Sequence, residues 1–290
     1  MAASNYTKIE RLRSYSSAFS RSVFTDIIKY DDFSRLNHLF STYNASLKSA
    51  RTYSDYIKYL YRSIKKEYRC EYVYKNELIN QLLLKRYGTK TTIAINEFRV
   101  GGSIADFVLF NGESKAFEIK TEYDTDKRLE QQLDDYSKLF QKCFIVIPNE
   151  LVSQYELSIS ANIGIIALSI ENGRINLKEV RAAAADDTID TCVLMRSLRT
   201  SEFKNIVSAY FGMLPDVSCF EMFDTCEKWM ESIPYAVLNK LFLTEIKKRE
   251  NSTHLLRSLP AEIRQICLSM NLTKKQIPSL LEKLNKPINL

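Results

Sequence analysis

The chain has 290 residues, 45% hydrophobic and 26% charged, which is the composition of an ordinary globular protein and not of a disordered or low-complexity one. Its longest apolar runs, at 143–148 and 163–170, are much shorter than the roughly 20 residues of a membrane-spanning helix. The net charge of +6 is uneven: residues 1–75 hold 14 Lys and Arg against 7 Asp and Glu, residues 76–180 hold 12 against 15, and residues 181–290 hold 15 against 13.

The N-terminus and the cysteines indicate the compartment. Residues 1–17 are polar and lack the apolar segment of a secretory signal, so we expect a cytoplasmic protein. The cysteines form no CxxC pair and the chain has only 2 histidines, which disfavours a Cys/His zinc site and a His-dependent triad. We therefore expect reduced, mostly buried cysteines, namely Cys70, Cys143, Cys192, Cys219, Cys226 and Cys267.

Residues 1–74 are predicted to form a basic helical region. Apolar residues recur at helical spacing from Tyr53 to Tyr68, and Thr52 or Ser54 is placed to cap that helix. Its other face carries a set of cations that we predict to bind nucleic acid: Lys58, Arg62, Lys65 and Lys66, with Arg69 beyond them. Several tyrosines are interleaved with these cations, a pattern that suits phosphate contacts combined with base stacking. The alternative is a surface helix whose tyrosines only pack on neighbouring elements.

Residues 75–181 have the pattern of an α/β core. A helix over 76–87, ended by Gly88, precedes three strands. The first two strands are joined by a Gly-Gly turn and the last two by an Asn-Gly turn, and strand–helix–strand units follow. The hairpins imply antiparallel strands and the later units imply parallel ones, so we expect a mixed sheet with helices on both faces. The predicted segments are strands 91–100, 103–110 and 115–121, helix 126–140, strand 143–148, helix 150–159, strand 163–170, and a turn at Asn172-Gly173 into a last extended run.

Residues 182–290 are predicted to be helical again, after a linker over 182–190. Within them, 260–284 has the pattern of two helices around a short turn, with Thr273 as the N-cap of the second. This pair resembles small helical DNA-binding modules of the SAP type. A plain packing hairpin is the alternative, because helical hairpins are common.

Charged residues inside otherwise apolar strands point to chemistry. Asp106 lies in the strand 103–110, and Glu118 and Lys120 lie in the next strand. Burying a charge is costly unless it is paired or binds a metal, and two converging carboxylates form a hard-oxygen site suited to Mg²⁺ or Mn²⁺. The acid-x-Lys triplet alone carries no weight, since it also occurs at a predicted hairpin tip and in a helical stretch. The strand context of Glu118 carries the signal.

The spacing of these residues resembles a known signature. Asp106 followed by Glu118-Ile119-Lys120 is similar to the motif of the PD-(D/E)XK phosphodiesterase superfamily, and Gln132-x-x-x-Tyr136 is similar to the motif of its RecB-like branch. The longer string through Asp124 and Arg128 resembles an uncharacterised bacterial and phage family of that superfamily. The resemblance covers about residues 75–150.

The resemblance implies a three-layer α/β/α, restriction-endonuclease-like core in which Asp106 and Glu118 hold the metal and Lys120 serves the attacking water. Gln132 and Tyr136 would support the site or contact the strand being cut. A glutamate of the first core helix often joins the ligands, and Glu77 lies at that place.

The sequence departs from the family at one position and leaves other assignments open. Relatives often have Arg where this chain has Ile104, which puts a phosphate or carboxylate partner in doubt. Glu97 competes as a further carboxylate, and Glu77 has the alternative of a solvated helix residue. Arg128 is a candidate for phosphate contact, and its spacing from Asp124 also suits a helix-end ion pair.

The sequence thus predicts an Mg²⁺-dependent (or Mn²⁺-dependent) nuclease that hydrolyses phosphodiesters, with DNA favoured over RNA, in defence against or processing of foreign or phage DNA. The basic flank and acidic middle suit this activity, and they equally suit a solvated surface. The alternative is a catalytically silent nucleic-acid-binding or protein-interaction factor on a nuclease-like fold, in which the three charged residues form a buried ion-pair network. No membrane is expected, and a protein partner or a homo-oligomer is left open.

Overall fold

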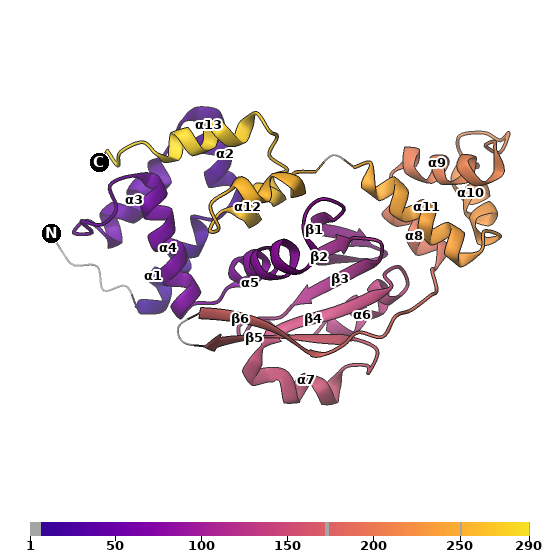
Figure 1. The fold of residues 1–290 in the computed structure, drawn as a ribbon, viewed down its shortest axis with the longest axis horizontal. Coiled ribbons are helices and arrows are strands. Elements are labelled where there is room, and N and C mark those ends of the chain that lie inside the picture. The colour runs from indigo at the N-terminus through magenta and orange to yellow at the C-terminus, as the bar shows by residue number, and fades with distance from the viewer. Residues whose placement is uncertain (1–6, 172–173, 250, 290) are drawn as a thin grey trace. The chain divides into compact units, whose positions relative to one another are not determined.

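The structure is a computed structural model that describes residues 7–171, 174–249 and 251–289 (Figure 1). The chain divides into two compact units, and neither is continuous in sequence. Unit 1 comprises residues 1–86, 170–176 and 252–290, and unit 2 comprises 87–169 and 177–251. The segment 252–290 therefore belongs with the N-terminal helices and not with the helices that directly precede it.

Unit 1 is helical. Its elements are α1 (Lys8–Ser17), α2 (Arg21–Tyr30), α3 (Ser34–Tyr43), α4 (Tyr53–Glu67), α5 (Glu71–Glu77), the π-helical η1 (Leu78–Tyr87), the 3₁₀ η3 (Thr253–Ser258), α12 (Arg264–Ser269) and α13 (Gln276–Leu284). Helix α4 confirms the predicted helix, and Thr52 caps it by exchanging hydrogen bonds with Asp55. Helix α5 begins five residues before the predicted start at 76 and continues into η1. Gly88 follows at a φ of +73°, as a helix-ending glycine does.

The tyrosines around α4 do not form the predicted base-stacking surface. Tyr56, Tyr61 and Tyr74 are 6% exposed or less, and Tyr72 donates a hydrogen bond to the backbone oxygen of Glu262. Tyr56, Tyr61 and Tyr72 form edge-to-face and stacked pairs with other rings of unit 1. The alternative interpretation of these residues, packing on neighbouring elements, is the one the structure shows.

A six-stranded mixed sheet flanked by helices confirms the predicted α/β fold. The strand order is β1 (Ile93–Val100), β2 (Ser103–Phe110), β3 (Ser114–Ile119), β4 (Lys142–Pro148), β5 (Gly164–Glu171) and β6 (Arg174–Arg181). Neighbours are antiparallel from β1 to β3 and parallel from β3 to β5, as the hairpins and the strand–helix–strand units predicted. The predicted turn at Asn172-Gly173 lies outside the described residues.

The helices of unit 2 lie in two groups along the chain. They are α6 (Leu129–Ser137), the 3₁₀ η2 (Asn149–Leu151), α7 (Val152–Ser158), α8 (Thr191–Ser197), α9 (Thr200–Phe211), α10 (Met222–Glu231) and α11 (Tyr235–Lys247). One hydrophobic core joins sheet residues such as Val108 and Ile145 to α6 and to α8 through α11, for example by the contact of Phe110 with Phe242. The predicted linker, 182–190, contains neither helix nor strand.

Two further findings concern the whole described chain. The six cysteines are free in the structure: Cys143, Cys226 and Cys267 are buried, Cys70 and Cys192 are half-buried, and Cys219 is exposed. Among the residues that the structure describes, no helix combines the length and the apolar character needed to cross a bilayer.

Candidate active site

The two predicted carboxylates come from adjacent antiparallel strands. Phe107 pairs with Phe117 at the end of the β2–β3 ladder, and the same register places Asp106 opposite Glu118. Asp106 Oδ2 accepts a hydrogen bond of 2.9 Å from the backbone N–H of Ile119. The ladder thus ends where the carboxylate takes over a backbone donor, and this fixes Asp106 beside β3.

Helix α6 completes the cluster. The Tyr136 hydroxyl lies 2.7 Å from Glu118 Oε2 and 2.8 Å from the backbone oxygen of Ile104, two acceptors between which its single proton is shared. Lys120 Nζ lies 3.0 Å from Glu118 Oε1 and 3.1 Å from Gln132 Oε1. Five residues predicted from the motif therefore converge: Asp106, Glu118, Lys120, Gln132 and Tyr136.

The electrostatics of the cluster are unfavourable to a second negative charge. Burial, and then the charge of Asp106, raise the pKa of Glu118 to about 7, against the lowering effects of Tyr136 and Lys120. Burial and the adjacent Glu118 also raise the pKa of Tyr136 well above its ordinary value, so its hydroxyl remains a donor. Because burial and Asp106 both disfavour the ionised form of Glu118, a cation that binds beside this carboxylate stabilises its negative charge.

The residues fit a divalent cation that is bound mostly by other ligands. Within the described part of the chain, no three His, Cys, Asp or Glu side chains are grouped so that they could hold a metal together. Asp106 and Glu118 form a two-carboxylate pair, and Mg²⁺ is commonly bound by one or two carboxylates together with waters and substrate phosphates. The donor set matches that mode and not a site built wholly from protein ligands.

Side chains outside this five-residue cluster hold the loop from β3 to α6. Asp124, a candidate partner of Arg128, accepts hydrogen bonds of 2.7 and 2.8 Å from the backbone N and Oγ1 of Thr121. Asp126 accepts a hydrogen bond from the Tyr155 hydroxyl. The Thr121–Asp124 contact is local, three residues apart, whereas the Tyr155–Asp126 contact joins segments 29 residues apart that no local pattern relates.

Asp135, on α6, anchors the turn between β1 and β2. Its Oδ2 accepts a hydrogen bond of 2.6 Å from the Ser103 hydroxyl, and its carboxylate packs on Gly101 and Gly102. The Asp135 side chain is buried, whereas that of its neighbour Asp134 is exposed.

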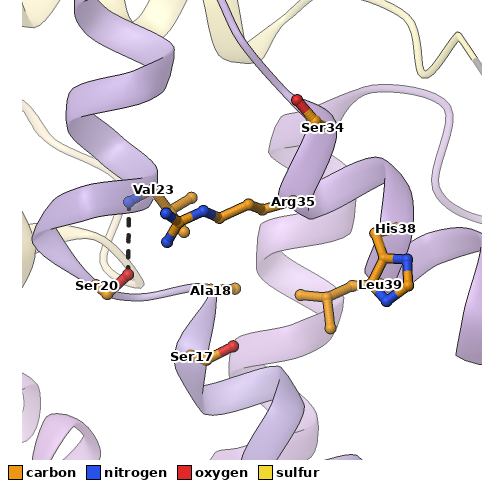
Figure 2. A pocket seen from close by; sticks show the side chains of 8 residues that line it. All are labelled: Ser17, Ala18, Ser20, Val23, Ser34, Arg35, His38 and Leu39. Carbon is orange, nitrogen blue, oxygen red and sulfur yellow. Dashed lines mark hydrogen bonds between the residues drawn. The ribbon is translucent and has the colours of Figure 1, made fainter.

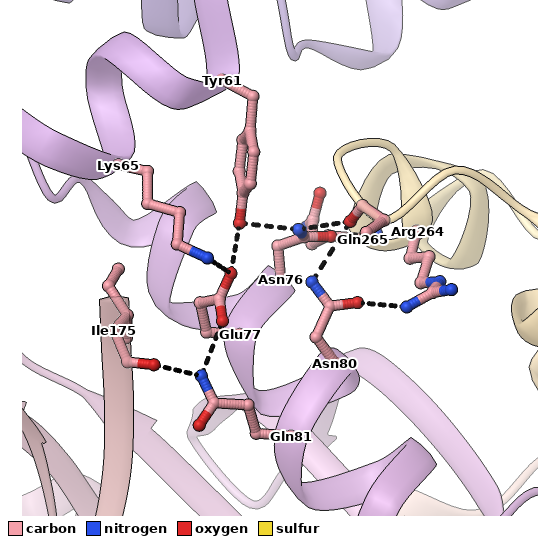
Figure 3. Close-up of polar contacts among 10 residues, drawn as sticks. Tyr61, Lys65, Asn76, Glu77, Asn80, Gln81, Ile175, Arg264 and Gln265 are labelled. Atoms are coloured by element: carbon pink, nitrogen blue, oxygen red, sulfur yellow. Dashed lines mark hydrogen bonds and ion pairs between the residues drawn. The ribbon is translucent and has the colours of Figure 1, made fainter. Parts of the chain in front are cut away.

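Glu77 lies in unit 1 with partners of its own (Figure 3). It is 2% exposed, so the alternative of a solvated helix residue is wrong. Its Oε1 lies 2.8 Å from the Tyr61 hydroxyl and 2.7 Å from Lys65 Nζ, and its Oε2 accepts a bond of 2.7 Å from Gln81. Its assignment as a metal ligand stays a prediction. The competing Glu97 is exposed, with a left-handed φ of 58°.

The predicted nucleic-acid-binding residues separate into two groups. Lys58, Arg62 and Lys66 are exposed along α4, and Arg128 is exposed at the start of α6. Lys65 instead turns toward Glu77, and 30% of its side chain is exposed. The two neighbouring lysines of the sequence therefore have different surroundings.

A separate cavity of about 420 Å³ lies in unit 1 (Figure 2). Its lining consists of Ser17, Ala18, Ser20, Val23, Ser34, Arg35, His38 and Leu39. The Arg35 guanidinium is already held by the Ser22 hydroxyl at 2.8 Å and by Asp26 at 3.6 Å. None of the predicted site residues lines this cavity.

Comparison with known proteins identifies a family, a curated relative and a solved structure. The family described as bacteriophage P4 protein cII matches residues 64–271. Protein cII of Enterobacteria phage P4 is 27% identical over 182 residues, which are 62% of this chain and 67% of that protein. A solved structure, the SPO1766 protein of unknown function from Silicibacter pomeroyi, is 16% identical, and the match covers 45% of this chain and 86% of that one. Its TM-score of 0.28 is too low to indicate a shared fold.

Proposed function

We propose that this chain, which belongs to the bacteriophage P4 protein cII family, is a metal-dependent nuclease with a PD-(D/E)XK-type site in unit 2. The observation that carries the proposal is the convergence of Asp106, Glu118 and Lys120 at the end of the β2–β3 ladder, with Glu118 held by α6. A buried cluster in a sheet, in which two neighbouring carboxylates repel each other, is typical of a functional site.

The side chains divide the work. Asp106 and Glu118 would hold Mg²⁺ or Mn²⁺, and the bound ion would supply Lewis-acid activation of water and stabilisation of the leaving oxygen. The ammonium group of Lys120 is positively charged and can donate a proton. It lies at the edge of the carboxylate pair, where it orients the attacking water. Gln132 positions the Lys120 ammonium, and Tyr136 positions the Glu118 carboxylate.

The substrate class follows from chemistry and charge. A hard cation held by two carboxylates leaves coordination positions for phosphate oxygens, and an exposed cationic helix provides attraction for a polyanion. We propose DNA as the substrate and the cytoplasm as the location. A relative from a phage supports a role in the processing of, or defence against, phage DNA.

The test is a cleavage assay. Purified protein is incubated with labelled linear, circular and single-stranded DNA and with RNA, each with Mg²⁺, Mn²⁺ or EDTA. We expect metal-dependent cleavage that falls by at least about 100-fold in Asp106→Asn and in Lys120→Ala, since each removes a group acting on the reacting atoms. Lys247→Ala is the matched control, because Lys247 also lies two residues after a glutamate but is exposed on α11.

Two outcomes would reject the nuclease. Cleavage retained in both site variants would show that the activity belongs elsewhere or to a contaminant. Absence of cleavage with every substrate and both metals, by protein that still binds DNA in EDTA, would leave the binding factor as the better description.

A further inference from the structure

Charge is strongly segregated between the two units. Unit 1 holds 23 Lys and Arg against 11 Asp and Glu, a net charge of +12, and unit 2 holds 18 against 24, a net charge of −6. The candidate active site thus lies in the acidic unit, which by itself repels a polyanion. Attraction for nucleic acid must come from unit 1.

Helix α4 concentrates part of this charge in one line, which we call the α4 strip: Lys58, Arg62 and Lys66. All three side chains are exposed. They recur every four residues, so they lie on successive turns along about 12 Å of one helix face. Exposed Arg11 lies on α1, and the Lys8–Glu67 ion pair of 2.9 Å joins α1 to the end of α4.

The acidic neighbours of the strip, Asp55 near Lys58 and Glu67 near Lys66, each have a closer partner. Asp55 accepts hydrogen bonds from the backbone N–H and the hydroxyl of Thr52 as part of the helix cap. Glu67 is paired with Lys8. Lys65, by contrast, neutralises the buried Glu77 and is not part of the strip.

The surroundings of the strip decide what it binds. The tyrosines of α4 are buried or half-buried, so this face offers no free ring on which an unpaired base could stack. The apolar face of α4 is buried within unit 1, whereas helices that bind membranes insert that face into lipid. What remains exposed is a row of three cations at intervals of about 6 Å along the helix axis.

We infer that the α4 strip docks the phosphate backbone of duplex DNA without reading or stacking its bases. This inference rests on the proposed function for its substrate class. It adds that unit 1, through α4, supplies the affinity while unit 2 supplies the chemistry. Each cation that neutralises a phosphate displaces about 0.9 counterion from B-DNA, so three contacts give a salt dependence with a slope of about −2.7.

The test measures binding in EDTA, where metal-dependent cleavage does not take place. Fluorescence anisotropy follows a short labelled duplex, and the same strand alone, between about 50 and 200 mM salt. In Lys58→Gln/Arg62→Gln/Lys66→Gln we expect on the order of tenfold weaker duplex binding and a slope less steep by about 2 to 3. The matched control, Lys228→Gln/Lys240→Gln/Lys247→Gln, removes the same charge from exposed positions of unit 2 and should leave the slope unchanged.

Three results would overturn the proposal that the α4 strip docks duplex DNA. One is an equal loss of affinity in both triple variants, which would reflect net charge alone. Another is single-stranded binding that depends on the strip more than duplex binding does. The third is a preference of the strip for vesicles containing phosphatidylserine over duplex.

The nuclease and the strip can fail separately. The variant Asp106→Asn should lose cleavage and keep strip-dependent binding. Cleavage that persists without strip-dependent binding would reject the strip and leave the nuclease in place.

Discussion

At the scale of single residues, Glu118 links the site to pH. Its folded pKa of about 7 lies above the ordinary 4.5, so between these values the folded protein holds a proton that the unfolded chain releases. The free energy of unfolding of the metal-free protein should therefore fall as pH rises from about 4.5 to 7. The total decrease expected from this shift is roughly 3 kcal/mol.

Urea unfolding in EDTA at several pH values tests this, with Trp229 fluorescence as the signal, since the chain's 1 Trp lies in α10 of unit 2. Glu118→Gln removes the titrating group, so its stability should not share the decrease. Parallel pH profiles for the two proteins would contradict the raised pKa.

The residues of the site could be predicted because their signal is local. Asp106 and Glu118 are charges in short apolar strands, Lys120 directly follows the second of these strands, and Gln132 and Tyr136 are one helical turn apart. The different roles of Lys65 and Lys66 could not be predicted, because both occupy the polar side of one helix. The difference comes from Glu77, which a separate helix brings against Lys65.

At the scale of elements, Gly164 at the start of β5 shows how tightly the parallel strands pack. A Cβ there would lie 2.4 Å from Cδ1 of Phe144 and 2.8 Å from the backbone N of Ala183. The Phe144 ring stacks on Phe117, with ring centroids 5.2 Å apart, so it has little freedom to move away. Position 164 therefore requires glycine, the residue without a side chain.

We expect Gly164→Ala to destabilise unit 2 by about 2 kcal/mol or more, because overpacking forces backbone or rotamer strain. Gly102→Ala is the control, since its nearest atom is Oδ2 of Asp135 at an ordinary 3.7 Å. It should change stability by less than about 0.5 kcal/mol. Thermal unfolding of the three proteins, followed at Trp229, makes the comparison. Equal stability of both variants would disprove the steric argument.

The succession of helices and strands along residues 76–170 was predicted from periodicity and turn residues, and the structure confirms it. Boundaries were less well predicted. The helix predicted over 126–140 is α6, Leu129–Ser137, because Asp124 and Asp126 make loop contacts in place of a first helical turn. Helix α5 also begins earlier than predicted, at Glu71, and its fully buried Val73 and Tyr74 extend the apolar face of Leu78 by one turn.

At the scale of the whole molecule, unit 1 depends on residues far apart in sequence. Asn76 is fully buried, donates a bond of 2.7 Å to the backbone oxygen of Ala261 and accepts one of 3.0 Å from the backbone N–H of Gln265 (Figure 3). Lys283 on α13 donates to the backbone oxygens of Ile27 and Ile28. No local pattern predicts this closure, since it pairs segments more than 180 residues apart.

A chain that ends at Asn251 should therefore lose the structure of unit 1 and keep that of unit 2. Removal of α12 and α13 leaves Asn76 with unpaired buried groups and exposes apolar surface on α2, α4 and α5. Circular dichroism should show a loss of helix well beyond the deleted residues, while the Trp229 melting transition persists. Helix loss limited to the deleted segment would refute the dependence.

The split of unit 1 along the chain also has a consequence for its biosynthesis. A ribosome delivers α1 to α5 first, then almost the whole of unit 2, and only afterwards the helices α12 and α13 that close unit 1. Until then the helix faces that are buried in the complete unit 1 stay exposed, and chaperones and proteases can reach their apolar residues. Translation that stops or shifts frame within unit 2 therefore yields a product in which α12 and α13 do not close unit 1, and such incompletely folded chains are substrates for chaperones and proteases.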